Sequence, residues 1–152
     1  MKSVIGVVII IISLISCEAK TNVETAKETA NLLEGTWQLI TGTLVEKGDT
    51  TVTDYTKKIS FIKIINSTHF AFLQHDLSKG KNADSVFAAG GGKYALKDST
   101  YTEHLEYCNA REWEANDFEF TVTIKNDTLI QHGLEKVGDI ERLNTERYVR
   151  LK

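Results

Sequence analysis

The strongest constraint on the fold is a series of short β-rich segments spaced almost evenly from about residue 33 to the carboxyl terminus. The clearest is segment 118–124, in which four apolar side chains alternate with polar ones: Phe118, Phe120, Val122 and Ile124. Strict alternation places these side chains on one face of an extended chain, which predicts a half-buried β-strand. We expect this apolar face to form part of the wall of the core.

Similar segments recur along the rest of the chain, at 37–41, 59–65, 69–74, 85–89, 93–96, 100–108, 129–134 and 146–151. Turn-forming residues separate several of them, notably Asn66-Ser67-Thr68 and Asn126-Asp127. The chain contains no proline, which agrees with sheet throughout because proline interrupts ladder hydrogen bonding. Eight to ten short strands without a long helical pattern predict an all-β domain, either a β-sandwich or an up-and-down barrel.

A different pattern precedes this domain. Lys2 is followed by an almost wholly aliphatic run at 4–15, and the small residue Ser16 comes directly before Cys17. A charged start, a short apolar run and a small residue are the layout of a secretory signal peptide. The run is too short for a membrane-spanning helix, which needs roughly 20 apolar residues. We therefore interpret residues 1–16 as a signal peptide.

The residues around the expected cleavage site, Leu14-Ile15-Ser16-Cys17, resemble the lipobox of bacterial lipoproteins. This resemblance implies that Cys17 is lipidated and becomes the new amino terminus. Segment 17–32 is polar, with a weak helical pattern from about 23 to 32, and would then be a tether for the domain at 33–152. The implied location is the cell envelope, with the protein attached by lipid to a bacterial membrane on the periplasmic side or at the cell surface.

Charge and cysteine content narrow the possible partners. Removal of residues 1–16 takes away one of 18 Lys and Arg residues and none of 21 Asp and Glu residues, which leaves a net charge of −4. The sequence shows no basic cluster that would follow a phosphate backbone, so we expect no nucleic-acid partner. With Cys17 lipidated, Cys108 has no partner for an intramolecular disulfide. We expect a monomer that is stabilised by core packing.

The first and last strands of the expected domain carry a recognisable sequence pattern. Gly35-Thr36-Trp37 at the first strand and Arg150 near the end of the chain resemble the pattern of lipocalin and calycin barrels. Four further segments are similar to the lipocalin-like domains of secreted Bacteroidetes lipoproteins: Phe87 to Tyr94 with its three glycines, Tyr101-Thr102-Glu103, Asp127-Thr128-Leu129, and Arg147-Tyr148-Val149-Arg150. The resemblance covers about residues 33–152.

This resemblance implies an up-and-down antiparallel barrel of about eight strands with a cavity for a small apolar or amphipathic ligand. Trp37 would close one end of the barrel, with Gly35 opening the first strand and Arg150 packing across the indole. A guanidinium over an indole gains about 0.5 to 2 kcal/mol, and here it would also join the first strand to the last.

The strand at 100–108 contains the most informative polar residue, Glu103. It shares a face with Tyr101, Leu105 and Tyr107, and we predict that this more apolar face points inward. A carboxylate inside a barrel is costly unless it is paired or hydrogen-bonded. Glu103 is therefore either an anchor for a ligand or part of a structural hydrogen bond to a neighbouring Tyr or Arg.

Further side chains are expected to face the same cavity. Gln74 shares a parity with Phe70 and Phe72, and Tyr94 follows the three glycines. Tyr and Gln supply orienting hydrogen bonds in a mostly apolar pocket. The predicted ligand-binding residues are Gln74, Tyr94, Tyr101, Glu103 and Tyr107; plain core packing is the alternative interpretation for these side chains.

The sequence gives little support for a metal site or for a phosphate-binding loop. His104, Glu106 and Cys108 alternate on one strand face, but alternate residues lie about 6.6 Å apart, too far for three neighbours to reach one zinc ion at about 2.0 to 2.3 Å. The glycines at 90–92 are followed by Lys93 and Tyr94 rather than by the Ser or Thr of a phosphate loop. We expect no metal site and no cofactor.

Three classes of function remain. The first is a binding module that holds a small hydrophobic ligand. The second is an interaction or inhibitor module that contacts a partner protein through the loops at 80–84 and 111–116, the latter carrying Trp113. An enzyme is the least supported class, because no nucleophile–base pair is visible and Glu103 would have to carry the chemistry. A co-purified ligand would favour the first class, and a solid core would exclude it.

Overall fold

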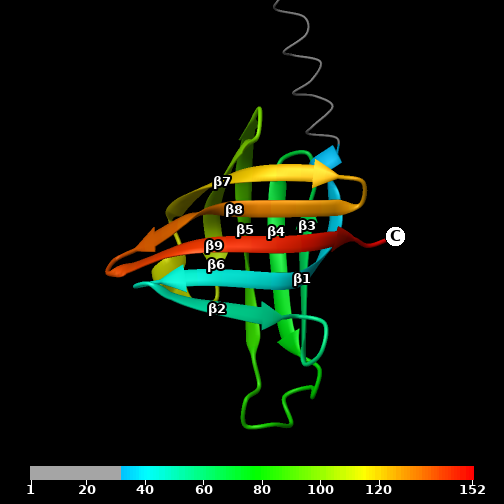
Figure 1. The fold of residues 1–152 in the computed structure, drawn as a ribbon, viewed down its shortest axis with the longest axis vertical. Helices are drawn as coiled ribbons and strands as arrows, with labels where there is room; N and C mark the ends of the chain where they lie inside the picture. The colour runs from blue at the N-terminus through cyan, green and yellow to red at the C-terminus, as the bar shows by residue number, and fades with distance from the viewer. Residues whose placement is uncertain (1–31) are drawn as a thin grey trace, which may run out of the picture.

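The structure is a computed structural model that describes residues 32–152 (Figure 1). The signal peptide, Cys17 and all of the tether except residue 32 lie outside the described residues. The strands within that range are β1 (Gly35–Glu46), β2 (Asp49–Asp54), β3 (Ile59–Ile65), β4 (His69–Asp76), β5 (Phe87–Lys97), β6 (Thr100–Cys108), β7 (Asn116–Lys125), β8 (Thr128–Val137) and β9 (Ile140–Arg150). A single 3-10 turn, η1 (Arg111–Trp113), precedes β7.

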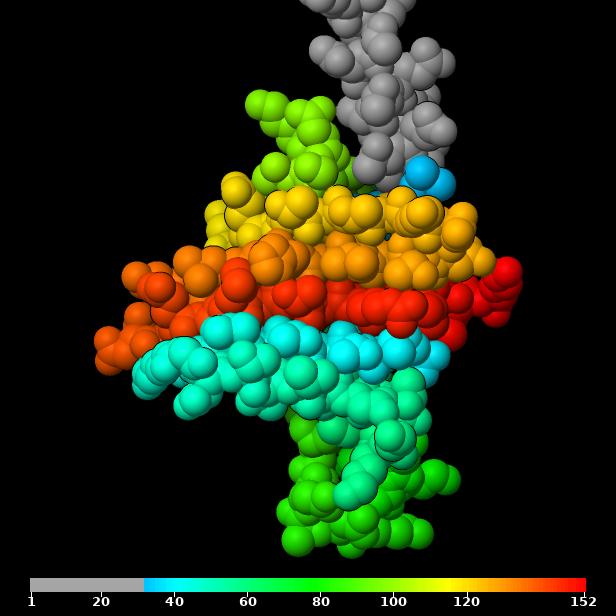
Figure 2. Space-filling view, viewed as in Figure 1, coloured from blue at the N-terminus to red at the C-terminus, as the bar shows by residue number. Residues whose placement is uncertain are grey.

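Every pair of neighbouring strands is antiparallel, and β1 pairs with β9 as well as with β3. This pairing closes β1 and β3 to β9 into an eight-stranded up-and-down barrel, which confirms the predicted fold class. In Figure 1, β7, β8, β9, β1 and β2 run across the front, and β3, β4 and β5 cross behind them. Figure 2 shows that the front strands cover this face as a continuous layer, while the segment between β4 and β5 projects beyond it.

Strand β2 was not expected from the sequence. One edge of β1 pairs with β3 from Gly35 to Gln38 and then with β2 from Thr41 to Glu46. The change of partner occurs at Ile40, where the register with β9 also shifts and where the backbone N–H of Tyr55 donates to the Ile40 carbonyl at 3.0 Å. β2 therefore widens the barrel wall at the end where β1 finishes.

The other end of the barrel is closed by residues near both termini. Leu33 is fully buried, and the indole Nε1 of Trp37 donates to its carbonyl at 2.8 Å. The guanidinium carbon of Arg150 lies 4.0 Å from the centre of the Trp37 ring, and the same guanidinium donates to the carbonyls of Glu34 and Leu32. A Cβ at Gly35, whose φ is +141°, would lie 2.4 Å from Arg150 Nη1. The chain thus enters and leaves the barrel at this closed end.

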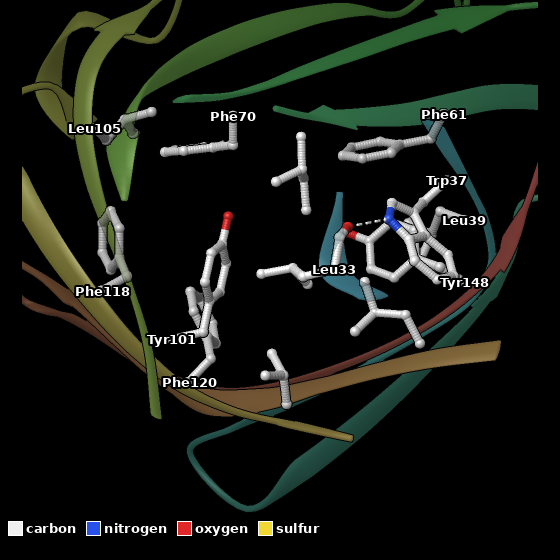
Figure 3. Close-up of a cluster of buried hydrophobic side chains, with 13 residues drawn as sticks. Leu33, Trp37, Leu39, Phe61, Phe70, Tyr101, Leu105, Phe118, Phe120 and Tyr148 are labelled. Atoms are coloured by element: carbon white, nitrogen blue, oxygen red, sulfur yellow. Dashed lines mark hydrogen bonds between the residues drawn. The ribbon is translucent and has the colours of Figure 1, made fainter. Parts of the chain in front are cut away.

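The core fills the half of the barrel next to that end (Figure 3). Trp37, Leu39, Tyr101, Leu129 and Tyr148 are almost completely buried there. Phe118, Phe120 and Val122 also face inward, as the alternation on β7 predicts. Burial of large apolar side chains is the main stabilising contribution in a domain without a disulfide.

The three glycines belong to one continuous strand, β5, whereas the sequence suggested two strands flanking them. A Cβ on Gly92 would lie 2.0 Å from the His104 carbonyl oxygen, so β5 and β6 approach each other more closely here than any side chain allows. The register shifts at the same place: Gly91 pairs with Tyr107 while Gly92 pairs with Leu105. This β-bulge adds one residue to β6.

The bulge reverses the inward–outward alternation in the last part of β6. Tyr101, Glu103 and Leu105 point inward as predicted, but Tyr107 points outward and is 70% exposed. The prediction that Tyr107 faces the interior is therefore wrong, because it assumed a regular strand through the whole of β6. Cys108 instead turns toward the inside of the barrel.

Candidate functional site: the open half of the barrel

The barrel encloses a cavity of about 330 Å³ in its open half. Its walls come from the second half of β1, from β2, from the beginnings of β3, β5, β7 and β9, and from the ends of β4, β6 and β8. A volume of this size lies at the lower end of the range for small-molecule sites. The interior is therefore not a solid core, which keeps the ligand-binding hypothesis open.

One part of the lining is aromatic. Phe61 and Phe72 stack with their ring centres 5.8 Å apart and their planes 9° apart, and Tyr55 meets Phe61 edge-on. Trp113 packs against Phe118 with ring centres 5.8 Å apart. The sequence placed Trp113 on a loop, and it does lie in η1, but its ring forms part of the cavity wall.

A buried lysine stands at the centre of the polar lining. Lys63 Nζ lies 2.6 Å from Glu103 Oε1 and 3.0 Å from Gln131 Oε1, and the lysine is 3% exposed. Burial disfavours the charged ammonium, but the carboxylates of Glu103 and Glu146 outweigh this effect and raise the pKa of Lys63 above its ordinary value. Lys63 is therefore a cation at neutral pH within the barrel wall.

Glu146 lies beside this pair on β9. Its Oε2 is 4.0 Å from Lys63 Nζ and accepts a hydrogen bond of 2.7 Å from the Tyr148 hydroxyl. Burial raises the pKa of the Glu146 carboxyl, although Lys63 and the Tyr148 hydroxyl act in the opposite direction. Burial and the charge of Glu146 also raise the pKa of Tyr148 well above its ordinary value, so this phenol keeps its proton and donates a hydrogen bond to Glu146.

A second ionic group lies nearer the mouth of the cavity. Arg142 Nε donates to Glu135 Oε2 at 2.5 Å, and Asn144 Nδ2 donates to the other carboxylate oxygen at 2.9 Å. The guanidinium carbon of Arg142 lies 4.5 Å from the centre of the Trp113 ring. Glu135 is thus satisfied within the wall, and Arg142 connects the ionic and aromatic parts of the lining.

Tyr101 occupies a position below Glu103, two residues closer to the closed end on the same face of β6. Its side chain is completely buried, and its hydroxyl has no hydrogen-bond partner within residues 32–152. Figure 3 shows the hydroxyl pointing away from the barrel wall into the interior. Burial and the charge of the neighbouring Glu103 carboxylate raise the pKa of Tyr101 well above its ordinary value, so the group is a neutral phenol beside Glu103.

The predicted ligand-binding residues do not all meet at the cavity. Gln74 and Glu103 line it, and Tyr101 lies buried next to Glu103. Tyr94 lies at the closed end, where its hydroxyl donates to the Asn66 carbonyl at 2.8 Å and its ring packs against Tyr101. Tyr107 lies outside the barrel.

Most of the ionic lining was missed by reading the sequence. Lys63 lies in 59–65, a segment that is apolar on both faces, so alternation does not show which face of the strand points inward. On β9 a usable signal exists, because Arg142, Asn144 and Glu146 alternate in step with the buried Tyr148. Extending the last strand back to residue 140 would have exposed that pattern. Gln131 and Glu135 similarly share the inward face of β8 with Leu129.

Two searches of the described residues give negative results. Within residues 32–152, no group of three or more His, Cys, Asp or Glu side chains is arranged to hold a metal ion. In the same range, no helix has the length and apolar character needed to cross a membrane. Among known proteins, no family model matches this chain and no curated protein is detectably similar to it.

Proposed function

We propose that residues 33–152 are a lipocalin-like binding domain that holds a small amphipathic ligand in the open half of the barrel. The observation that carries this proposal is the cavity of about 330 Å³, in which aromatic rings face buried ionic groups. Mostly apolar walls with a few fixed polar groups are typical of small-molecule sites, because the walls supply affinity and the polar groups orient the ligand.

The charged groups of the cavity lining are better explained by ligand binding than by core packing alone. A buried ion pair is weak evidence for stability, since apolar residues of similar volume often stabilise a fold equally well. The lining here contains five acidic or basic side chains beside space that the protein leaves unfilled: Lys63, Glu103, Glu135, Arg142 and Glu146. Such groups next to an accessible cavity are candidates for contacts with a ligand.

The proposal includes attachment to a membrane through lipid on Cys17. It is supported by the signal-peptide and lipobox patterns at the start of the chain. Metabolic labelling with a radioactive fatty acid tests this part, and a Cys17→Ser variant serves as the control. Label on the native chain and none on the variant is the expected result, and an unlabelled native chain would contradict lipidation.

Native mass spectrometry of the protein purified from its own cells tests the binding function. We expect a mass above that of the polypeptide and its modifications, which disappears on denaturation. A chain that carries no additional mass, and to which added amphipathic compounds do not bind, would contradict the proposal.

A separate observation favours the second candidate, an interaction module. Leu73, Phe87 and Tyr107 lie on the outer face of β4, β5 and β6 and are 42%, 65% and 70% exposed. Exposed apolar side chains that lie together often mark a contact surface. This surface differs from the loops predicted to make contact, because Trp113 of the 111–116 loop is used in the cavity wall. Loss of a chemical cross-link to a specific partner in a Phe87→Ser/Tyr107→Ser variant would support this candidate.

A further inference from the structure

The charges that line the cavity do not balance. The side chain of Lys63 is held by Glu103 and Gln131, and Arg142 is held by Glu135. With all five ionisable groups charged, three carboxylates face two cations. An unbalanced buried charge is costly, and the cost falls when an opposite charge enters the site.

Glu146 is the carboxylate without a cation of its own. Its Oε2 is 4.0 Å from Lys63 Nζ, beyond hydrogen-bond distance, and its side chain is 15% exposed toward the cavity. Within the described residues its one hydrogen bond comes from the Tyr148 hydroxyl. Because a carboxylate accepts up to about four hydrogen bonds, Glu146 retains the capacity to bind a donor supplied by a ligand.

Tyr101 continues the polar interior below the site. Its hydroxyl is completely buried, does not line the cavity and lies beside the Glu103 carboxylate, whose charge helps to keep the phenol protonated. Glu103 therefore already has Lys63 and Tyr101 as neighbours, and Glu146 is the carboxylate that a ligand in the cavity can reach.

The aromatic part of the lining favours the same class of ligand. Phe61, Phe72 and Trp113 line the cavity, and Arg142 already lies over the Trp113 ring. Below the cavity, Lys63 Nζ lies 5.5 to 6.0 Å from the ring centres of the core residues Phe70, Tyr101 and Tyr148. The faces of aromatic rings attract cations. An anionic ligand would instead have to separate Lys63 from Glu103, or Arg142 from Glu135, in a cavity that is already negative.

We propose that the ligand is an amphipathic amine whose ammonium group is paired with Glu146 and whose apolar body lies against the aromatic wall. The inference rests on the proposed binding function and specifies the chemical class of its ligand. The ammonium would complete the charge balance of the lining and would favour the charged form of Glu146 over the protonated form that burial favours.

Isothermal titration calorimetry with three probes of matched apolar body tests this inference: 4-phenylbutylamine, 4-phenylbutanol and 4-phenylbutyrate. We expect the amine to bind at least about tenfold more tightly than the alcohol, as a charge-assisted hydrogen bond implies, and the butyrate to bind most weakly. Equal affinities, or tightest binding of the butyrate, would overturn the amine assignment while leaving the binding function intact. Binding of none of the three, to a protein that also carries no ligand when purified, would overturn both.

Variants locate the contact. Glu146→Gln keeps the shape of the side chain and should lower the affinity for the amine about tenfold or more without changing that for the alcohol. Glu119→Gln, on the outer face of β7, is the matched control and should change neither. Tyr101→Phe, at a buried side chain that does not line the cavity, is a second control and should leave amine binding unchanged. Unchanged amine affinity in Glu146→Gln would refute the assigned contact, and Glu146→Asp, which draws the carboxylate back from the cavity, decides if Glu146→Gln does not fold.

Discussion

Replacement of Lys63 by methionine tests whether the ionic network is part of the structure or incidental to it. Methionine preserves most of the side-chain volume but removes the ammonium group, its hydrogen bond of 2.6 Å to Glu103 and its hydrogen bond of 3.0 Å to Gln131. The variant leaves Glu103 in the interior without its cation and removes the positive charge that lies 4.0 Å from Glu146. Removal of one partner from a buried pair destabilises a protein by about 3 to 5 kcal/mol. For a domain of this size, that corresponds to a fall in Tm of roughly 10 to 20 °C.

The pH dependence of this loss follows from the pKa values. The pKa of Lys63 is raised in the folded state, so its stabilising contribution is complete below the usual lysine value and is lost only as pH rises through the higher folded value. At neutral pH the native protein therefore has the full contribution. The pKa of Glu146 is also raised, and it rises further without Lys63. The stability of the variant should then fall as pH increases above the usual glutamate pKa, so the deficit is smaller at pH 5 than at pH 7.5.

Urea unfolding followed by circular dichroism at pH 5 and pH 7.5 measures both effects. Lys136→Met is the control, because Lys136 pairs with Glu141 at 3.0 Å while both side chains are more than half exposed. We expect the control to lose no more than about 1 kcal/mol at either pH. A Lys63→Met protein as stable as this control at pH 7.5, or one whose deficit grows as pH falls, would refute the argument.

Three further predictions concern the barrel itself. Arg150→Met removes the hydrogen bonds to two carbonyls and the cation over Trp37. It should lower the free energy of unfolding by about 2 to 4 kcal/mol in urea titrations. A loss smaller than that of Lys136→Met would contradict the stabilising role of the closed end. Gly92→Ala forces a Cβ against the His104 carbonyl and should cost about 1 to 3 kcal/mol, measured as a lower Tm. Tyr107→Ser should leave ligand affinity unchanged in calorimetry, and weaker binding would show that this side chain does reach the cavity.

The period-two pattern predicted the parts of the fold where strands are regular. It gave the correct inward face of β7, and it correctly placed Tyr101 and Glu103 inside the barrel. It failed at Tyr107, because a β-bulge changes the parity and depends on the close approach of Gly92 to the β6 backbone. Such an approach is a property of two strands together and leaves no alternation signal in either one.

The candidate site was predictable only in part for a related reason. Glu103 stood out because its neighbours on one face are aromatic or aliphatic, so the carboxylate was conspicuous. Lys63 did not stand out, because Ile62 and Ile64 make the opposite face equally apolar. Its pairing with Glu103 joins residues 40 positions apart in the chain. Only the closure of the barrel decides which acidic residue meets which basic one.

The closed end also determines how the cavity is presented to its surroundings. Leu32 and Arg150 lie together there, so the described chain begins and ends on the side opposite the mouth. If the chain is anchored through Cys17, its point of attachment therefore belongs to the end of the barrel that is farthest from the cavity. The domain can then be held at a surface while the rim around Trp113 stays accessible to ligands in the aqueous phase.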